Sequence, residues 1–164
     1  MFRKKSLIAF FIFFTLLAGS NVRATEINFD SVRVGQMSAF QSDGNYFSGV
    51  LLWTPSYALA ENFHVGLDLG GSLLSIHNQD QFLATEYIIK GIYDLNPRFS
   101  FDAGIGAQTW TNSGDTFLEL VTNGTYRLEE KFLMGIDQIW LGYAFINSSV
   151  LVTHELRVGI GFNF

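Results

Sequence analysis

The chain contains no cysteine, which excludes a disulfide framework and any metal site built on thiolates. It contains only two prolines among 164 residues, a composition that favours tight turns over long irregular loops. Basic residues are also scarce, since ten Lys and Arg stand against fifteen Asp and Glu. Four of the ten basic residues precede residue 25, so the remainder of the chain is strongly acidic and has no basic footprint for nucleic acid.

Long apolar runs are missing as well, except near the amino terminus. Residues 7–18 form an apolar run that is shorter than the roughly 18–20 residues a helix needs to span a bilayer. Basic residues at 3–5 precede this run, and Ala24 follows it as the small side chain that a signal peptidase requires. We therefore expect a cleaved signal peptide over 1–24 and a mature domain over 25–164.

The chain does have a strict alternation of apolar and polar residues. Residues 63–70 place Phe, Val, Leu and Leu on one face and His, Gly, Asp and Gly on the other. The same pattern returns at 99–106 and at 132–137, and the three segments begin 36 and 33 residues apart. A period of two is typical of β-strands, and the spacing fits one pair of antiparallel strands with its two connections.

Between these three segments lie further strand-like segments that would run antiparallel to them, and two more begin and end the series. We therefore expect eight strands. Their ranges are 27–41, 46–54, 63–70, 83–94, 99–106, 117–128, 132–137 and 151–164. Four connections are rich in Gly, Asn, Asp and Ser, as hairpin turns are, and they span 42–45, 76–81, 112–116 and 145–149. Three others span 55–62, 95–98 and 129–131. This alternation predicts an all-β, eight-stranded antiparallel up-and-down barrel with both termini on one side, and with a bulge beyond Asp137.

The face opposite the apolar stripe decides between a soluble and a transmembrane barrel. A transmembrane barrel turns its apolar face outward and its polar face inward. Seven glycines share the charged face, and a crowded interior explains missing side chains better than an open surface does; they are Gly66, Gly70, Gly104, Gly106, Gly135, Gly159 and Gly161. We therefore expect a transmembrane barrel with a charge network in its lumen, made of Arg33, Asp68, Glu86, Lys90, Asp102, Glu119, Arg127, Asp137, Glu155 and Arg157.

Aromatic residues fall near the expected strand ends, where the girdles of a transmembrane barrel belong. One girdle is expected to contain Phe63, Tyr93, Phe99, Tyr126, Phe132, Phe162 and Phe164. The other is expected to contain Phe40, Phe82, Trp110, Phe117 and Trp140.

The last strand carries the most specific motif. Outward residues alternate there with polar or small ones, and the chain stops on an aromatic residue; the outward set is Val158, Ile160, Phe162 and Phe164. This strand resembles the terminal strand of Gram-negative outer-membrane proteins, which the barrel assembly machinery recognises. The whole chain resembles the small OmpA/OmpX-type barrels, without an appended periplasmic domain because no residue follows Phe164. The resemblance implies an outer-membrane location, periplasmic termini, contact with membrane lipid and lipopolysaccharide, and no cofactor.

Barrels of this class include lipid A deacylases and palmitoyltransferases, so the histidines need consideration. His154 is expected on the outward face, but the residue two positions later is Leu156, whereas the deacylase pattern resembles His-x-Ser. No spacing among His64, His77 and His154 resembles a zinc site, so we expect neither a catalytic residue nor a metal.

Three glutamates, Glu86, Glu119 and Glu155, are expected to point inward, where they could bind a cation or proton. The alternative is a plug of ion pairs with the inward Arg and Lys residues, because an eight-stranded interior is narrow enough to be filled by side chains. We favour the plug. The sequence thus predicts a non-enzymatic barrel with a structural or cell-surface interaction role, with a narrow channel or a lipid A-modifying enzyme as the alternatives.

Overall fold

The computed structural model describes residues 27–28, 31–41, 44–75, 82–132, 135–147 and 152–163. These residues form β1 (Ile27–Asn28), β2 (Ser31–Gln41), β3 (Gly44–Trp53), β4 (Ser56–Ala60), β5 (Phe63–Ser75), β6 (Phe82–Asp94), β7 (Phe99–Trp110), β8 (Thr116–Phe132), β9 (Ile136–Asn147) and β10 (Val152–Asn163). Within these ranges no helix is long and apolar enough to cross a membrane. The signal peptide predicted over 1–24 lies outside the described residues and stays a prediction.

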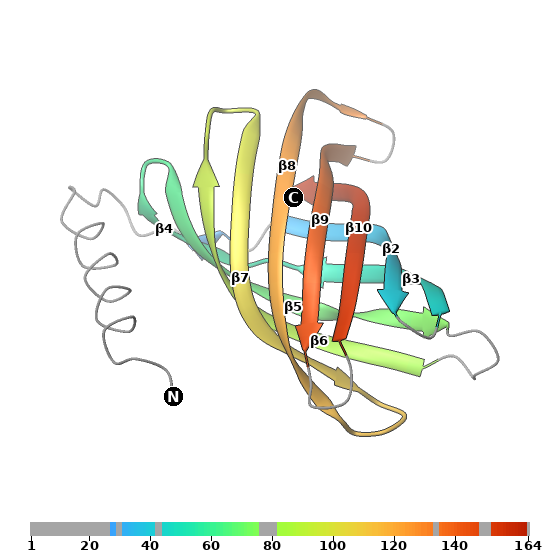
Figure 1. The fold of residues 1–164 in the computed structure, drawn as a ribbon. Coiled ribbons are helices and arrows are strands. Elements are labelled where there is room, and N and C mark those ends of the chain that lie inside the picture. Colours follow the sequence, from blue (N-terminus) through green and yellow to red (C-terminus); the bar gives the residue numbers. More distant parts are fainter. Residues whose placement is uncertain are drawn as a thin grey trace, which may run out of the picture.

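Eight of the strands close into an antiparallel ring. Its order is β2, β3, β5, β6, β7, β8, β9 and β10, and β10 pairs back onto β2 from Asn163 opposite Ser31 to His154 opposite Phe40. Figure 1 shows this closure, with the first and last colours of the barrel lying side by side. The predicted eight-stranded antiparallel barrel is confirmed, and its first ring strand begins at the same end at which its last ring strand ends.

One predicted connection, 55–62, is largely strand. β4 continues the direction of β3 along β5, and β1 pairs with β4 outside the ring. The break at Thr54 and Pro55 coincides with the residue that has no N–H to donate to a ladder. Two backbone hydrogen bonds connect the break to the neighbouring strands: Thr54 N donates to Ser31 O of β2 at 2.8 Å, and Leu67 N of β5 donates to Pro55 O at 2.9 Å. The turn itself is reduced to Glu61 and Asn62.

The prediction for the β8–β9 hairpin was wrong in its register. β8 runs on through the expected connection 129–131 to Phe132, and β9 begins only at Ile136. Gly135 therefore lies in the connection, with a φ of 85°, and not on a strand facing the lumen. The register shift lies between Arg127 and Phe132 rather than beyond Asp137. Residues 133–134 lie outside the described ranges.

At the opposite end of the barrel, one connection is fully described and is short. The β7–β8 turn spans residues 111–115, close to the predicted 112–116, and is fastened by Trp110 N bonding to Asp115 O at 2.9 Å. Gly114 occupies the left-handed region there, with a φ of 75°, which explains why a glycine stands at this position. The predicted turns 42–45, 76–81 and 145–149 fall wholly or partly outside the described residues.

Burial alternates along the strands with the charged face inside. In β8, Phe117, Glu119 and Val121 are buried, whereas Leu118 and Leu120 are exposed. The exposed large apolar residues cover the outer wall of the ring; they include Leu51, Leu73, Leu83, Tyr87, Ile89, Phe101, Ile105, Leu141, Leu156 and Val158. This is the inside-out pattern that the alternation predicted.

The interior also contains apolar side chains that the sequence analysis had placed outside. Trp140 is only 1% exposed and packs against Val50 and Leu52, and Phe117 is buried as well. Both had been assigned to an outward girdle, and both assignments are wrong. The even-numbered residues of β9 are buried from Gln138 onward, and in β8 the odd-numbered residues are buried from Phe117 to Thr125. The Trp140 indole donates a hydrogen bond to Ile160 O at 3.2 Å. The interior therefore has an apolar component beside its charges.

Close backbone packing explains several inward glycines, most clearly Gly159 of β10. A Cβ atom on Gly159 would lie 2.2 Å from Val34 O and 2.5 Å from Gly35 Cα on the neighbouring strand β2. Backbone atoms cannot give way as a flexible side chain can, so only glycine fits there.

Replacing Gly159 by alanine should therefore lower the free energy of unfolding by about 1–3 kcal/mol through overpacking. Gly124→Ala is the matched control, because nothing lies within 4 Å of a Cβ added at Gly124. Denaturant unfolding of the two variants in lipid vesicles measures the difference. Equal stabilities of the two variants would show that β2 and β10 are not packed this closely.

Candidate functional site

One group of buried charges surrounds Arg157. Alternation in β10, β6 and β8 turns Glu155, Arg157, Glu86 and Glu119 inward, and all four are at most 2% exposed. Arg157 Nη1 lies 2.9 Å from Glu86 Oε2, and its Nη2 lies 2.6 Å from Glu119 Oε1 and 2.5 Å from Glu155 Oε2. We call these four residues the Arg157 cluster.

One guanidinium in the Arg157 cluster faces three carboxyl groups. Glu119 Oε2 has no hydrogen-bond partner among the described residues. Gln108 Nε2 lies 3.4 Å from Glu86 Oε1 as a further donor, and Trp110 Nε1 holds Gln108 by donating to its Oε1 at 2.7 Å. Arg157 therefore supplies most of the hydrogen bonds that keep these carboxyl groups buried, because buried charges are stable only when paired and hydrogen-bonded.

A second group, the Asp102 cluster, contains Arg33, Asp68, Lys90 and Asp102. Arg33 Nη1 lies 3.1 Å from Asp102 Oδ2, and Lys90 Nζ lies 2.7 Å from Asp68 Oδ1 and 3.6 Å from Asp102 Oδ2. Two positive and two negative groups balance one another there, and all four are buried. The structure thus brings these predicted residues together in a group separate from the Arg157 cluster.

Uncharged side chains complete the Asp102 cluster, and none of them was among the predicted site residues. Asn123 Nδ2 donates to Asp102 Oδ1 at 2.5 Å, Thr54 Oγ1 donates to Asp68 Oδ1 at 2.5 Å, and Arg33 Nη2 donates to Thr125 Oγ1 at 3.1 Å. Asn123 and Thr125 share the buried face of β8 with Glu119, and that position was the available signal. Thr54 lies at the break between β3 and β4, where alternation gives no such signal.

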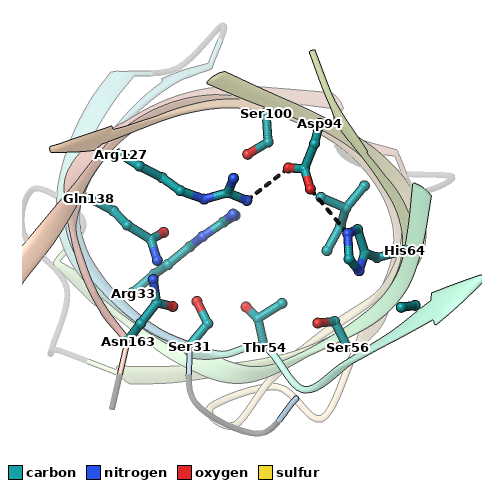
Figure 2. A pocket seen from close by; sticks show the side chains of 12 residues that line it. Ser31, Arg33, Thr54, Ser56, His64, Asp94, Ser100, Arg127, Gln138 and Asn163 are labelled. Carbon is teal, nitrogen blue, oxygen red and sulfur yellow. Dashed lines mark hydrogen bonds and ion pairs between the residues drawn. The ribbon is translucent and has the colours of Figure 1, made fainter. Parts of the chain in front are cut away.

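A third group lies at the end of the barrel where β2 begins and β10 ends. Arg127 Nη2 donates to Asp94 Oδ1 at 2.8 Å, and His64 Nε2 lies 3.1 Å from Asp94 Oδ2. Asp94 was not among the predicted network residues, because it stands at the boundary between β6 and its turn. Figure 2 shows Arg127, Asp94 and His64 joined in this way at the rim of the opening.

Asp137 differs from its prediction. The next residue, Gln138, is buried in the interior. Because successive residues of a strand point to opposite faces, Asp137 belongs to the outward face of β9. Its carboxylate accepts hydrogen bonds from the backbone N of Asn163, at 3.2 and 3.3 Å. The expectation extended the alternation of 132–137, which is not one strand, and therefore assigned Asp137 to the wrong face.

A cavity of about 430 Å³ opens beside this third group. Figure 2 shows side chains from around the ring pointing into it, among them Arg33, Arg127, His64 and Gln138. We call it the mouth pocket. Most of the residues that line it are polar, because the inward-facing residues of the strand ends carry hydroxyl, amide and charged groups; these include Ser31, Thr54, Ser56, Ser100 and Asn163. Ala58 and Ile92 add apolar surface.

His154 lies on the outer wall near the other end of the barrel. Its Nδ1 is hydrogen-bonded to the Tyr143 hydroxyl, and its ring centroid lies 5.3 Å from that of Phe145. Leu156, two residues later, is exposed on the same face. Among the described residues, no three His, Asp or Glu side chains are arranged to hold a metal ion, and His77 lies outside those residues.

The predicted assembly motif occupies the end of β10. Val158 is exposed on the outer wall, whereas Ile160 and Phe162 are partly buried, and β10 pairs with both β9 and β2 along this stretch. Phe164 lies outside the described residues. The three described motif residues thus share one face of β10, and the role of the motif in assembly stays a prediction.

Comparison with known proteins shows a likeness of fold. The chain matches no protein-family model and no curated protein sequence. Ail, the attachment invasion locus protein of Yersinia pestis, solved with the heparin analogue sucrose octasulfate, aligns with a TM-score of 0.58 at 14% identity, over 87% of this chain and 100% of that one. Neisserial surface protein A aligns with a TM-score of 0.51 at 13% identity, over 87% and 100%. A de novo designed transmembrane β-barrel gives 0.50 at 11%, over 84% and 99%.

Proposed function

We propose that this chain is an integral outer-membrane β-barrel of a Gram-negative bacterium, without enzymatic activity, whose lumen is closed by ion pairs. Its role is structural or interactive at the cell surface, in a membrane of phospholipid and lipopolysaccharide. The fold shared with Ail and with Neisserial surface protein A supports this proposal, as does the apolar outer wall. Signal cleavage after Ala24 and insertion by the barrel assembly machinery belong to the same proposal, with both termini on the periplasmic side.

The main support for a closed lumen is that two ion pairs join strands on opposite sides of the ring. In the order of the eight ring strands, β6 and β10 stand opposite each other, as do β2 and β7. Arg157 of β10 pairs with Glu86 of β6, and Arg33 of β2 pairs with Asp102 of β7. Side chains that meet from opposite strands occupy the axis of the barrel, as expected for an interior only wide enough for side chains.

The purified protein should accordingly give no steady conductance in planar lipid bilayers. The two ion-paired clusters interrupt any path for hydrated ions along the axis, because breaking a buried ion pair is costly. Single-channel recording at both polarities measures this, with an open porin as a positive control in the same membranes. A reproducible unitary conductance of the wild-type protein would contradict the closed lumen and favour the narrow channel.

One observation favours the channel as a second candidate. The mouth pocket is an opening at one end of the lumen, and a channel needs an entrance of this kind. The Asp102 cluster borders it, since Arg33 lines the pocket and belongs to that cluster. With the lumen closed, the mouth pocket is a vestibule that leads no further, and the bilayer recording distinguishes such a vestibule from the entrance of a channel.

The enzymatic alternative rests on His154, which is exposed at the outer wall beside Tyr143. A lipid A deacylase of the His-x-Ser type would need a serine where Leu156 stands. Mass spectrometry of lipid A from cells with and without the protein tests this alternative directly. A lipid A species that depends on the protein would overturn the non-enzymatic proposal.

A further inference from the structure

The two carboxylates at and behind the mouth pocket, Asp94 and Asp102, already have hydrogen-bond donors. Asp94 already accepts from Arg127 and His64. Asp102, behind the pocket, accepts from Arg33 and Asn123 and lies 3.6 Å from Lys90. The carboxylates near the pocket are therefore occupied.

The guanidinium groups of the pocket are not fully occupied. A guanidinium has five N–H donors. Arg33 is 4% exposed and uses one Nη1 and one Nη2 bond, and its Nε has no partner among the described residues. Arg127 uses Nη2 for Asp94 and Nη1 for Pro97 O at 3.3 Å. Figure 2 shows both guanidinium groups reaching into the same opening, from different strands.

We propose that the mouth pocket is a binding site for a small soluble oxyanion of the phosphate or sulfate type. The ion would take the second N–H groups of the Nη atoms of Arg127 and Arg33, for which guanidinium geometry is well suited. The Nε of Arg33 is itself buried and is not one of these donors. Ser100 and Gln138, which also line the pocket, supply uncharged donors around the same space. Because each nearby carboxylate keeps its own partner, an entering anion displaces none of them.

The position of the pocket favours a solute over a lipid headgroup. Its lining side chains come from the inward face of the strands, whereas the apolar residues that would hold acyl chains stand on the outer wall. The cavity of about 430 Å³ exceeds what a single phosphate ion fills, so water accompanies the ion. The site lies at the end where β2 begins and β10 ends, which in the proposed orientation faces the periplasm.

The test is a titration of the refolded mature protein in detergent micelles with inorganic phosphate, with sodium chloride at equal ionic strength as reference. NMR signals of the Gln138 and Asn163 side-chain amides and of the arginine Nε–H groups report the pocket directly. We expect saturable shifts of these signals with phosphate and none with chloride. Unsaturable shifts, or equal shifts with chloride, would overturn the proposal whether or not any variant folds.

Two variants separate the site from general charge effects. Arg127→Gln should weaken phosphate binding about tenfold or more, because a hydrogen bond to a charged group is lost. Arg98→Gln is the matched control, since Arg98 is exposed, pairs with Glu129 and does not line the pocket. Equal weakening by both variants would contradict the site. A second arm replaces inorganic phosphate with a short-chain phospholipid; saturation by the lipid but not by phosphate would also contradict a soluble ligand.

Discussion

Replacing Arg157 by alanine should lower the free energy of unfolding of the barrel by about 3–5 kcal/mol, or prevent folding altogether. The substitution leaves Glu86, Glu119 and Glu155 buried together without the guanidinium that bonds to all three. Removing one partner of a buried ion pair is costly because the remaining charge is neither solvated nor paired. Denaturant unfolding in lipid vesicles, followed by tryptophan fluorescence, measures the loss.

Two further variants show whether burial causes this effect. Arg98→Ala removes the same charge from an exposed pair with Glu129, and such surface pairs contribute at most about 1 kcal/mol. Glu155→Gln removes one of the three carboxylates and leaves Arg157 with two, so it should cost much less than Arg157→Ala. An Arg157→Ala variant as stable as Arg98→Ala would mean that the Arg157 cluster is solvated.

Arginine at Ile105 should destabilise the barrel by about 2–4 kcal/mol, the cost of a cationic side chain at the midplane of the lipid face. Ile105 is 54% exposed near the middle of β7, and it stands between Ile89 of β6 and Leu120 of β8. These neighbours are also exposed. The guanidinium therefore finds no protein partner there and must lie in hydrocarbon or distort the bilayer.

The control for Ile105→Arg is Asn112→Arg. Asn112 lies in the exposed β7–β8 turn, where an added arginine remains in water and should change stability little. Unfolding of both variants in vesicles of the same lipid gives the comparison. Equal tolerance of arginine at the two positions would show that the outer wall is not in contact with lipid.

The sequence was sufficient to predict the ring, and the reason is physical. A period of two in residues 63–70 and 99–106 fixes which face of each strand is buried, and one-residue errors would invert every side chain. The charged residues of β6, β7 and β10 could therefore be assigned to the interior from alternation alone. This assignment does not depend on the loop lengths, because alternation along a strand fixes the face of each residue.

Alternation could not predict where strands end or which charges meet. β8 extends through Glu129 and Glu130, whose exposed, charged side chains resemble those of a turn. The backbone nevertheless stays extended across a register shift, and Phe132 pairs again with Ile136. The pairing of Arg157 with Glu86 depends on the closure of the ring, which places β10 opposite β6. Distances across a barrel depend on register and tilt, and neither is encoded in a local pattern.

The same limit explains why some aromatic residues were predicted on the wrong face. Trp140 follows Asp137 by three positions, and residues 132–137 are not one strand, so their pattern could not show which residues of β9 point inward. In the structure, Gln138 and Trp140 share the inward face, and Gly142 follows them there. A close contact between Trp140 and the inward glycines Gly35 and Gly159 fills the space those glycines leave, a complementarity that only the three-dimensional arrangement reveals.

The central claim, that the apolar outer wall lies in lipid, is tested most directly by spin labels at adjacent positions of β6. The chain has no cysteine, so Ile88→Cys and Ile89→Cys each report one site. Ile89 is 63% exposed on the outer wall, whereas Ile88 is buried in the interior. In vesicles, the label at position 89 should collide frequently with dissolved oxygen and rarely with a water-soluble nickel chelate, and the label at 88 should be shielded from both. Frequent collision of the label at 89 with the nickel chelate would contradict a membrane-embedded barrel.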